Sequence, residues 1–391
     1  MKNTSEPTFK FNRQTLAQTL AAEMQNMVLF GQLAVLPNSG TFLSAPRRIG
    51  KSTFLQADLA PLLREKGHEV VYADLWADQR REPADLLKEA LIAALKAKAG
   101  RVRKATQALG LTKVTALASL SFDLNTAAGQ ENASLTQLLT QLADKSKTKK
   151  VVLIVDEAQQ ALATERGEAA MFALKAARDS LNANPAKPRL MLLCTGSSRS
   201  KLSGLVAWKT SPFYGAHVVD FPVMGAEFTQ AYAAYLNPRL AESMQLDLDA
   251  LNEAFVLLGH RPETFMQAAG VATTQALPEI GTVSQALLVQ AKKIKGQMLG
   301  ELQTQFDALP PVQQVLLLRI LEDESHFAPY AKESLTAYAA YVGEPVSVTL
   351  VQSSLAALVD KDIVWLAKRG GYSVDDPLWA VWFESSTTRG G

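Results

Sequence analysis

The chain has 391 residues, a length typical of two or three domains. Its 48% hydrophobic and 20% charged residues are typical of a globular protein with sizeable cores. A net charge of +2 does not produce the overall positive potential that would indicate nucleic-acid binding. The single cysteine, Cys194, excludes a disulfide framework or a zinc site made of cysteines. The first residues lack the apolar core of a signal peptide, and no apolar run reaches the ~18 residues of a membrane span. We therefore expect a cytoplasmic protein.

Alternating helical and strand-like patterns fill the first part of the chain. They predict a helix at 15–32, a strand at 41–44, a helix at 51–66, a strand at 70–76 and a helix at 83–99. The segment 114–125, VTALASLSFDLN, alternates like a strand, and Ser134 is placed to cap a helix over 135–146.

The loop after the first strand, SAPRRIGKSTFL, is the first candidate site. Gly50, Lys51 and Ser52 match the end of the phosphate-loop pattern, which would have glycine where this chain has Ala45. Backbone N–H groups at the start of the following helix would face phosphates, Lys51 would reach the β- and γ-phosphates, and Ser52 would bind Mg²⁺. The nucleotide contacts would come from Ala45, Pro46, Arg47, Arg48, Ile49, Gly50, Lys51, Ser52 and Thr53. The alternative is an ordinary basic turn between a strand and a helix.

A run of five aliphatic residues at 151–155, followed by Asp156 and Glu157, is the second candidate site. Such a run predicts a central parallel strand that is covered on both faces. Ligands of open α/β sheets lie at the carboxyl ends of strands, so these acids would meet the phosphate loop there. Asp156 would hold Mg²⁺ and Glu157 would orient or polarise the attacking water. Alternatively, the acids simply match the dipole of a following helix.

Two further strands complete the predicted sheet. A buried strand is expected at 189–198 and a fifth one at 217–223, so the alternation of strands and helices predicts a parallel, doubly wound α/β sheet. Thr195, Ser197 and Ser198 close the first of these strands and could bind a phosphate or the attacking water, or could form a plain turn.

From 226 onward the pattern becomes helical. We expect a P-loop core over 1–225 that includes the N-terminal helix, a helical lid over 226–300, and a winged-helix domain over 301–391, because its helices precede two short strands around a Gly-Gly turn. The expected recognition helix, 347–359, has no lysine or arginine, and the wing carries Lys368 and Arg369. Basic residues gather instead at 101–104, 145–150 and 292–295. Winged helices also dock proteins, so duplex DNA and a protein partner both stay open.

These motifs together resemble the archaeal-type ATPase group, close to the AAA and signal-transduction (STAND) ATPases. The resemblance is carried in order by SAPRRIGKSTFL, VVLIVDEAQQ, LLCTGSSRSKL, SPFYGAHVVDFPVM, GHRPETF and GGYSVDDPLWAVWF, over about residues 30–385. It implies ATP and Mg²⁺ binding, a five-stranded core, a helical lid, a winged-helix end, and a switch or motor role. It also implies that Arg261 and Pro262 face the nucleotide, with Pro262 against the adenine; a helix-breaking turn is the alternative.

The sequence departs from this group at two positions. Ala45 replaces the usual glycine, and Ala216 stands where an arginine often follows Tyr-Gly, which puts an inter-subunit arginine at that position in doubt. Arg199, Arg47 and Arg48 are candidate substitutes, since an arginine on the γ-phosphate accelerates hydrolysis by roughly 10³–10⁵. For each, a surface position or an ion pair is the alternative.

Three hypotheses follow for the function. The first is an ATP-hydrolysing switch or motor that acts on DNA or a partner protein and could assemble as a homo-oligomer. Its catalytic residues would be Glu157, Lys51, Ser197 and Arg199. The second, motivated by Ala45 and Ala216, is a nucleotide-gated binding module with little hydrolysis. The third is a DNA-binding regulator in which the winged helix dominates, which the base-free recognition helix disfavours.

Overall fold

The structure is a computed structural model that describes residues 9–25, 40–108, 133–146, 150–184, 187–274, 281–323, 327–368 and 371–387. The chain divides into two compact units. The core unit consists of Arg13–Ala45 and Ser52–Phe221, and the C-terminal unit of Met1–Asn12, Pro46–Lys51 and Pro222–Gly391. The strand-like segment expected at 114–125, and the expected helical residues beyond 25, lie outside the described residues. Among the described helices, none is both long and apolar enough to cross a membrane.

The core unit is built on the parallel, five-stranded sheet that the sequence predicts, with the strand order β2-β3-β4-β1-β5. Its strands are β1 (Thr41–Ser44), β2 (Glu69–Asp74), β3 (Val151–Asp156), β4 (Leu190–Gly196) and β5 (Val218–Asp220). All side chains of 151–155 are fully buried, as expected for a strand covered on both faces. Because β4 lies between β1 and β3, its carboxyl end adjoins both the loop after β1 and the acidic pair after β3.

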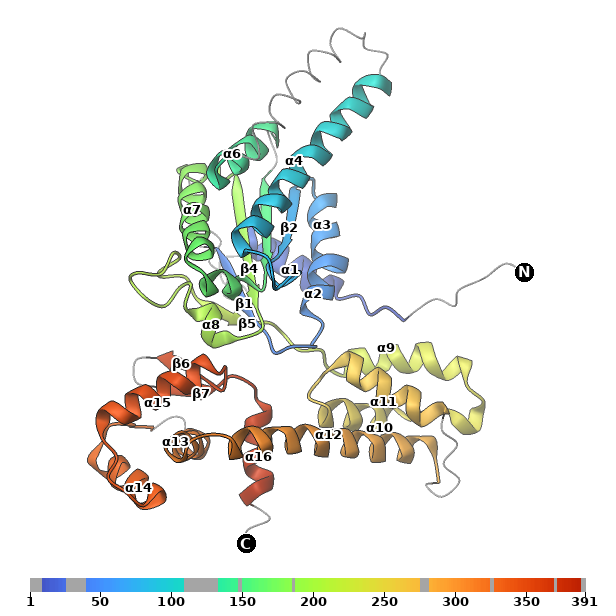
Figure 1. The fold of residues 1–391 in the computed structure, drawn as a ribbon. Helices are drawn as coiled ribbons and strands as arrows, with labels where there is room; N and C mark the ends of the chain where they lie inside the picture. Colours follow the sequence, from blue (N-terminus) through green and yellow to red (C-terminus); the bar gives the residue numbers. More distant parts are fainter. Residues whose placement is uncertain are drawn as a thin grey trace. The chain divides into compact units, whose positions relative to one another are not determined.

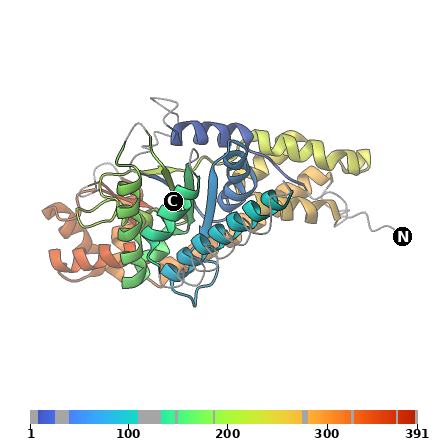
Figure 2. The ribbon, with the colours of Figure 1, turned by 90° about the horizontal axis from the view of Figure 1, so that it is seen from above.

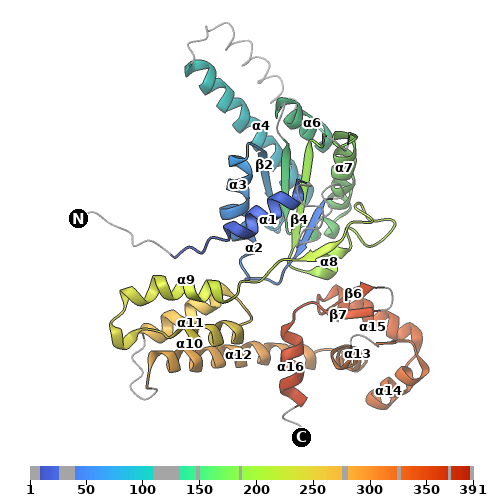
Figure 3. The ribbon, with the colours of Figure 1, turned by 180° about the vertical axis from the view of Figure 1, so that it is seen from behind.

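Helices cover both faces of this sheet. The helical segments of the core unit are α1 (Gln14–Met24), α2 (Lys51–Phe54, whose first residue is grouped with the C-terminal unit), the π-helical η1 (Leu55–Leu59), α3 (Ala60–Glu65), α4 (Pro83–Ala108), α6 (Leu135–Ser146), the 3₁₀-helical η2 (Ala158–Ala163), α7 (Glu165–Leu181) and α8 (Arg199–Ser203). Helix α4 passes in front of the sheet in Figure 1 and α1 passes in front of it in Figure 3; Figure 2 shows them on opposite sides of the strands. The predicted cap is confirmed, because the Ser134 hydroxyl accepts the N–H of Gln137 at 3.2 Å.

The first part of the C-terminal unit is a helical array with an aromatic core. It consists of α9 (Ala226–Leu236), the short 3₁₀ helices η3 (Asn237–Arg239) and η4 (Glu242–Met244), α10 (Leu248–Leu257), α11 (Pro262–Thr274) and α12 (Val283–Asp307). Phe228 stacks on Phe255 with ring centroids 4.8 Å apart, and Phe9 and Phe11 pack against Phe228 at 5.8 and 5.4 Å. Phe9 and Phe11 therefore pack against the core of this array.

The last part of the C-terminal unit has helices followed by an antiparallel hairpin (Figure 3). Its elements are α13 (Pro311–Glu322), α14 (Lys332–Val342), α15 (Val348–Asp360), β6 (Val364–Lys368), β7 (Gly371–Val374) and α16 (Leu378–Thr387). This order corresponds to the expected winged helix, an assignment that stays a prediction. The expected domain boundary at 300/301 falls inside α12, and the indole N–H of Trp382 on α16 donates to Gln303 of α12 at 3.1 Å. Helix α12 is thus shared by the array and the segment after it.

Candidate nucleotide-binding site

The loop from β1 to α2 begins at Ala45, where the phosphate-loop pattern has glycine. The Ala45 N–H donates to the Gly196 carbonyl at 3.0 Å, and the side chain is buried. Ala45 is not among the described non-glycine residues with positive φ, so its backbone conformation is one that alanine adopts without steric strain. The left-handed positions of the loop are instead Arg48, at φ 69°, and Gly50, at φ 86°. Positive φ at Arg48 was not expected from the sequence and is uncommon outside glycine.

Lys51 begins α2 directly after this loop, as the sequence predicts. Its side chain is buried, whereas those of Ser52, Arg47 and Arg48 are exposed. Helical structure continues without a break from Lys51 to Glu65, because α2, η1 and α3 follow one another. The first N–H groups of a helix have no partner within it and carry partial positive charge, so the start of α2 is suited to bind an anion.

Asp156 lies at the end of β3 and is 1% exposed. Its carboxylate accepts hydrogen bonds from three hydroxyl groups: Ser52 Oγ at 2.7 Å, Tyr72 Oη at 2.7 Å, and Thr195 Oγ1. Ser52 and Asp156, expected to be metal ligands, are therefore adjacent. A carboxylate and a hydroxyl suit Mg²⁺, which is usually held by one or two carboxylates together with substrate phosphates and water. Among the described residues, no group of three His, Cys, Asp or Glu side chains could hold a metal ion.

Tyr72 is a member of this cluster that the sequence did not reveal. Burial raises the pKa of its phenol, and the negative charge of Asp156 and the hydrogen bond to it raise that pKa further. The phenol therefore stays protonated and donates to Asp156. The available signal was the register of the parallel sheet, in which β2 lies beside β3 and pairs Tyr72 with Ile154, two residues before Asp156.

Glu157 has left-handed backbone geometry, with φ 53°, directly after the strand. Its N–H donates to Asp156 Oδ1 at 3.1 Å. Its own Oε2 accepts from Ser197 Oγ at 2.7 Å, from the Ser197 N–H at 3.2 Å and from Gln159 Nε2 at 2.6 Å. The two acids are thus held by different partners, Asp156 by Ser52 and Glu157 by the end of β4.

The end of β4 is shaped to let Gln159 reach Glu157. A Cβ atom on Gly196 would lie 2.5 Å from Gln159 Oε1, so any other residue there would displace this side chain. Gln159 is 3% exposed and was not expected to take part in the site. Its amide also lies 3.4 Å from Ser197 Oγ, which links Gln159, Glu157 and Ser197 in one hydrogen-bonded group.

The remaining expected residues are engaged within their own units. The Arg199 guanidinium pairs with Asp220 and donates to the Val218 carbonyl at 2.9 Å. Ser198 caps α8 by accepting the Lys201 N–H at 3.2 Å. In the C-terminal unit, Pro262 is buried at the start of α11, and the neighbouring Arg261 pairs with Asp376 at 3.0 Å. Ala216 is buried in the hydrophobic core of the core unit.

A phosphate loop after β1, an acidic pair after β3 and a further strand between them define a P-loop nucleotide-binding fold of the ATPase type. Residues 38–202 match the AAA domain family, and this part of the chain is an AAA-type P-loop ATPase domain. The P-loop ATPase part of the resemblance inferred from the motifs is thereby confirmed, and its winged-helix end stays a prediction.

Two solved structures share the fold over nearly the whole chain. A Walker-type ATPase of Pyrococcus abyssi is 19% identical, with a TM-score of 0.54 and 96% of each chain covered. The ADP form of the ORC2 protein of Aeropyrum pernix is 13% identical, with a TM-score of 0.53, covering 99% of this chain and 96% of that one. At these identities the likeness concerns the fold. No curated protein matches the sequence.

Proposed function

We propose that the protein is a Mg²⁺-dependent ATPase of the AAA type, a switch or motor that couples its nucleotide state to the engagement of DNA or a partner protein. The observation that carries this proposal is the separate placement of the two acids, with Asp156 bonded to Ser52 and Glu157 bonded to Ser197. In such surroundings one carboxylate can hold the metal while the other orients or activates the attacking water.

Each residue has a distinct task in this proposal. Lys51 and the N–H groups at the start of α2 bind the phosphates, while Ser52 and Asp156 hold the metal. Bound Mg²⁺ would neutralise charge on the phosphates during transfer. Glu157 accepts the proton of the attacking water, and Ser197 with Gln159 fixes the orientation of its carboxylate. The hydrogen bonds that Gln159 and Ser197 donate to Oε2 hold this carboxylate in one orientation.

The alternative of a nucleotide-gated module with little hydrolysis was motivated by Ala45 and Ala216. Since Ala45 does not occupy a left-handed position and its N–H is bonded to Gly196, the missing glycine gives no backbone reason for a defective loop. Hydrolysis is therefore the preferred proposal.

Of the two partner classes, the surface of α15 favours a protein. The helix carries no lysine or arginine, whereas a helix that docks on DNA usually presents clustered basic residues. It exposes Val348 (42%) and Leu350 (40%) instead. Leu350 also lines a cavity of about 370 Å³ together with Pro310, Val312 and Val342. Exposed apolar side chains beside a cavity are typical of protein contact sites.

The test separates binding from turnover. Glu157→Gln should keep ATP binding within about twofold of wild type while turnover falls by about 10² or more, because a general base is typically worth 10²–10⁴. The matched control is Glu168→Gln, an exposed residue of α7, which should leave both unchanged. Full turnover in Glu157→Gln would remove the role assigned to Glu157, and loss of ATP binding would show that the residue is structural.

A further inference from the structure

The edge of the sheet opposite the candidate nucleotide site contains a basic groove that the ATPase proposal does not use. The groove has a volume of about 590 Å³ and lies among α3, the start of β2, α4 and the end of α6. Its lining includes Arg64, Lys98, Arg101 and Lys145, with Glu69 as the one carboxylate. Four cations against one anion leave a surplus of three positive charges, although the whole chain carries only +2.

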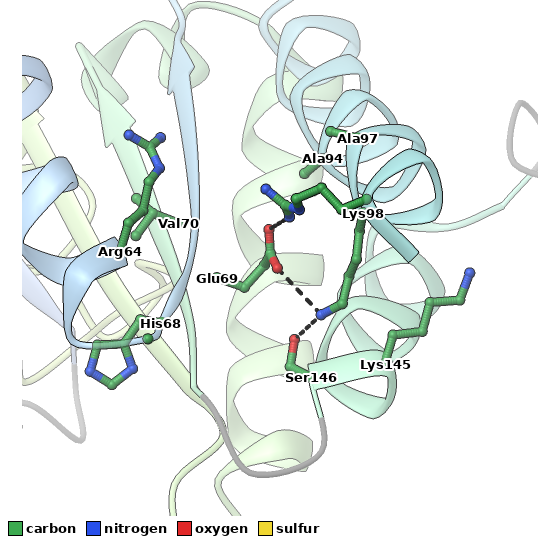
Figure 4. Close-up of a pocket in the computed structure, with 11 residues that line it drawn as sticks. Arg64, His68, Glu69, Val70, Ala94, Ala97, Lys98, Lys145 and Ser146 are labelled. Atoms are coloured by element: carbon green, nitrogen blue, oxygen red, sulfur yellow. Dashed lines mark hydrogen bonds and ion pairs between the residues drawn. The ribbon is translucent and has the colours of Figure 1, made fainter. Parts of the chain in front are cut away.

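The centre of the groove is an ordered cluster around Glu69. Lys98 Nζ lies 3.3 Å from Glu69 Oε2 and 2.5 Å from Ser146 Oγ, and Arg101 Nη2 lies 2.6 Å from Glu69 Oε1. Figure 4 shows Glu69 and Lys98 directed toward each other, with Ser146 beside the ammonium group. The Lys98 side chain is 13% exposed and that of Arg101 is 62% exposed, so one cation lies deep and the other at the rim. Glu69 holds both in place.

The outer cations extend this cluster along the groove. Figure 4 shows Arg64 on one side of the Glu69 group and Lys145 on the other. Ala94 and Ala97 on α4 and Val70 on β2 add an apolar wall. A volume within the range of small-molecule sites, an apolar wall and cations spread over the length of the groove are suited to a small ligand with several negative groups.

The groove is separate from the candidate nucleotide site. In the parallel register Glu69 pairs with Val151 and Asp74 with Asp156, so the two sites lie at opposite ends of β2 and β3. Five residues of strand correspond to roughly 16 Å. One nucleotide therefore cannot fill both sites through its phosphates.

We propose that this groove binds a phosphorylated ligand with two or more phosphate groups, as a site additional to the one that holds ATP. The guanidinium groups of Arg64 and Arg101 present forked donors that match phosphate oxygens, and a multivalent phosphate is favoured over a single carboxylate because the groove lining has a surplus of three positive charges. The same chemistry could come from a free phosphorylated small molecule or from the backbone of a nucleic acid. The proposal does not rest on ATP hydrolysis.

The test is calorimetric titration of the full chain carrying Lys51→Ala, which removes the phosphate-binding lysine of the other site, without ATP or Mg²⁺. The first probe is pyrophosphate and the second is a 20-base-pair duplex. In the same background, Arg64→Gln with Arg101→Gln should weaken binding at least about tenfold. The matched control, Arg80→Gln with Arg166→Gln, removes two exposed arginines from the same unit and should bind as the parent does.

Each outcome decides the proposal. Pyrophosphate binding that the groove variant loses and the control keeps supports a free phosphorylated ligand. Duplex binding with the same variant pattern, in the absence of pyrophosphate binding, supports the groove with a nucleic-acid backbone as the source. Absence of binding for both probes, or equal loss in the groove and control variants, overturns the proposal and leaves the cluster as a link between α4, α6 and β2. Thermal unfolding of each variant shows whether it is folded.

Discussion

Ser197 and Glu157 are joined twice, because both the hydroxyl and the backbone N–H of Ser197 donate to Glu157 Oε2, at 2.7 and 3.2 Å. A residue at the end of β4 thereby fixes a carboxylate that follows β3. Since β4 is also the neighbour of β1, the same strand end lies next to the loop that begins at Ala45. The orientation of the proposed general base thus depends on the sheet order.

The first prediction concerns this contact. Ser197→Ala removes the hydroxyl donor but keeps the N–H, so Glu157 keeps one of its two contacts with this residue and loses part of its orientation. We expect kcat for ATP to fall about 10- to 100-fold with KM nearly unchanged, because misplacing a catalytic group affects the chemical step. Steady-state kinetics measure this. Ser180→Ala, at an exposed position of α7, is the control, and a change confined to KM would contradict the positioning role.

The second prediction concerns the metal. Ser52→Ala removes the hydroxyl that lies 2.7 Å from Asp156. The Mg²⁺ concentration for half-maximal turnover should rise about tenfold, the effect of losing roughly 1.4 kcal/mol of metal binding. Chelation by EDTA should abolish turnover of the wild-type protein. Turnover that persists in EDTA, or an unchanged Mg²⁺ requirement in Ser52→Ala, would place the metal elsewhere.

The third prediction is a pH dependence that arises from Tyr72. Its folded-state pKa is raised above the ordinary value of 10.0, chiefly by burial and then by Asp156. A raised pKa means that the unfolded chain loses the phenolic proton first, so the contribution of Tyr72 to stability is complete below pH 10 and is lost as the pH rises above it. As the pH rises from 9 to 11, the free energy of unfolding should therefore decrease less in Tyr72→Phe than in the wild-type protein. Urea unfolding at several pH values measures the difference, and parallel pH profiles would contradict it.

The fourth prediction concerns the ion pair of Arg261 and Asp376, whose side chains are 19% and 37% exposed. A double-mutant cycle with Arg261→Gln and Asp376→Asn should give a coupling energy of about 0.5–1 kcal/mol, in the upper range for pairs near the surface. Thermal or urea unfolding supplies the four free energies. The more exposed pair of Arg319 and Glu322 serves as a comparison and should couple less strongly. Zero coupling between Arg261 and Asp376 would show that their contact adds nothing to stability.

The sequence predicted the elements whose signals are local. The aliphatic run at 151–155, the cap at Ser134 and the start of a helix at Lys51 each depend on neighbouring residues, and the structure has all three. Helix α4 runs to Ala108 rather than ending at 99, because Gly100 is accommodated inside the helix at a modest energetic cost.

The contacts that complete the candidate site could not be predicted from the sequence. Tyr72 and Gln159 reach Asp156 and Glu157 through strand register and through the space beside Gly196, which no local pattern encodes. Positive φ at Arg48 was missed because the pattern directs attention to glycine. The basic groups at 101–104 and 145–150 are separate in the sequence, and only the packing of α4 against α6 brings Arg101 and Lys145 to one groove.

The most direct measurement of the central claim is steady-state ATP hydrolysis by the purified chain, with Lys51→Ala as the blank and with duplex DNA present or absent. We predict Mg²⁺-dependent turnover above the blank. Because α15 has no lysine or arginine, we also predict that duplex DNA does not change the turnover rate by binding to that helix. Turnover by the wild-type protein that is no greater than that of Lys51→Ala, under conditions where ATP binds, would contradict the assignment of this site as an ATPase centre.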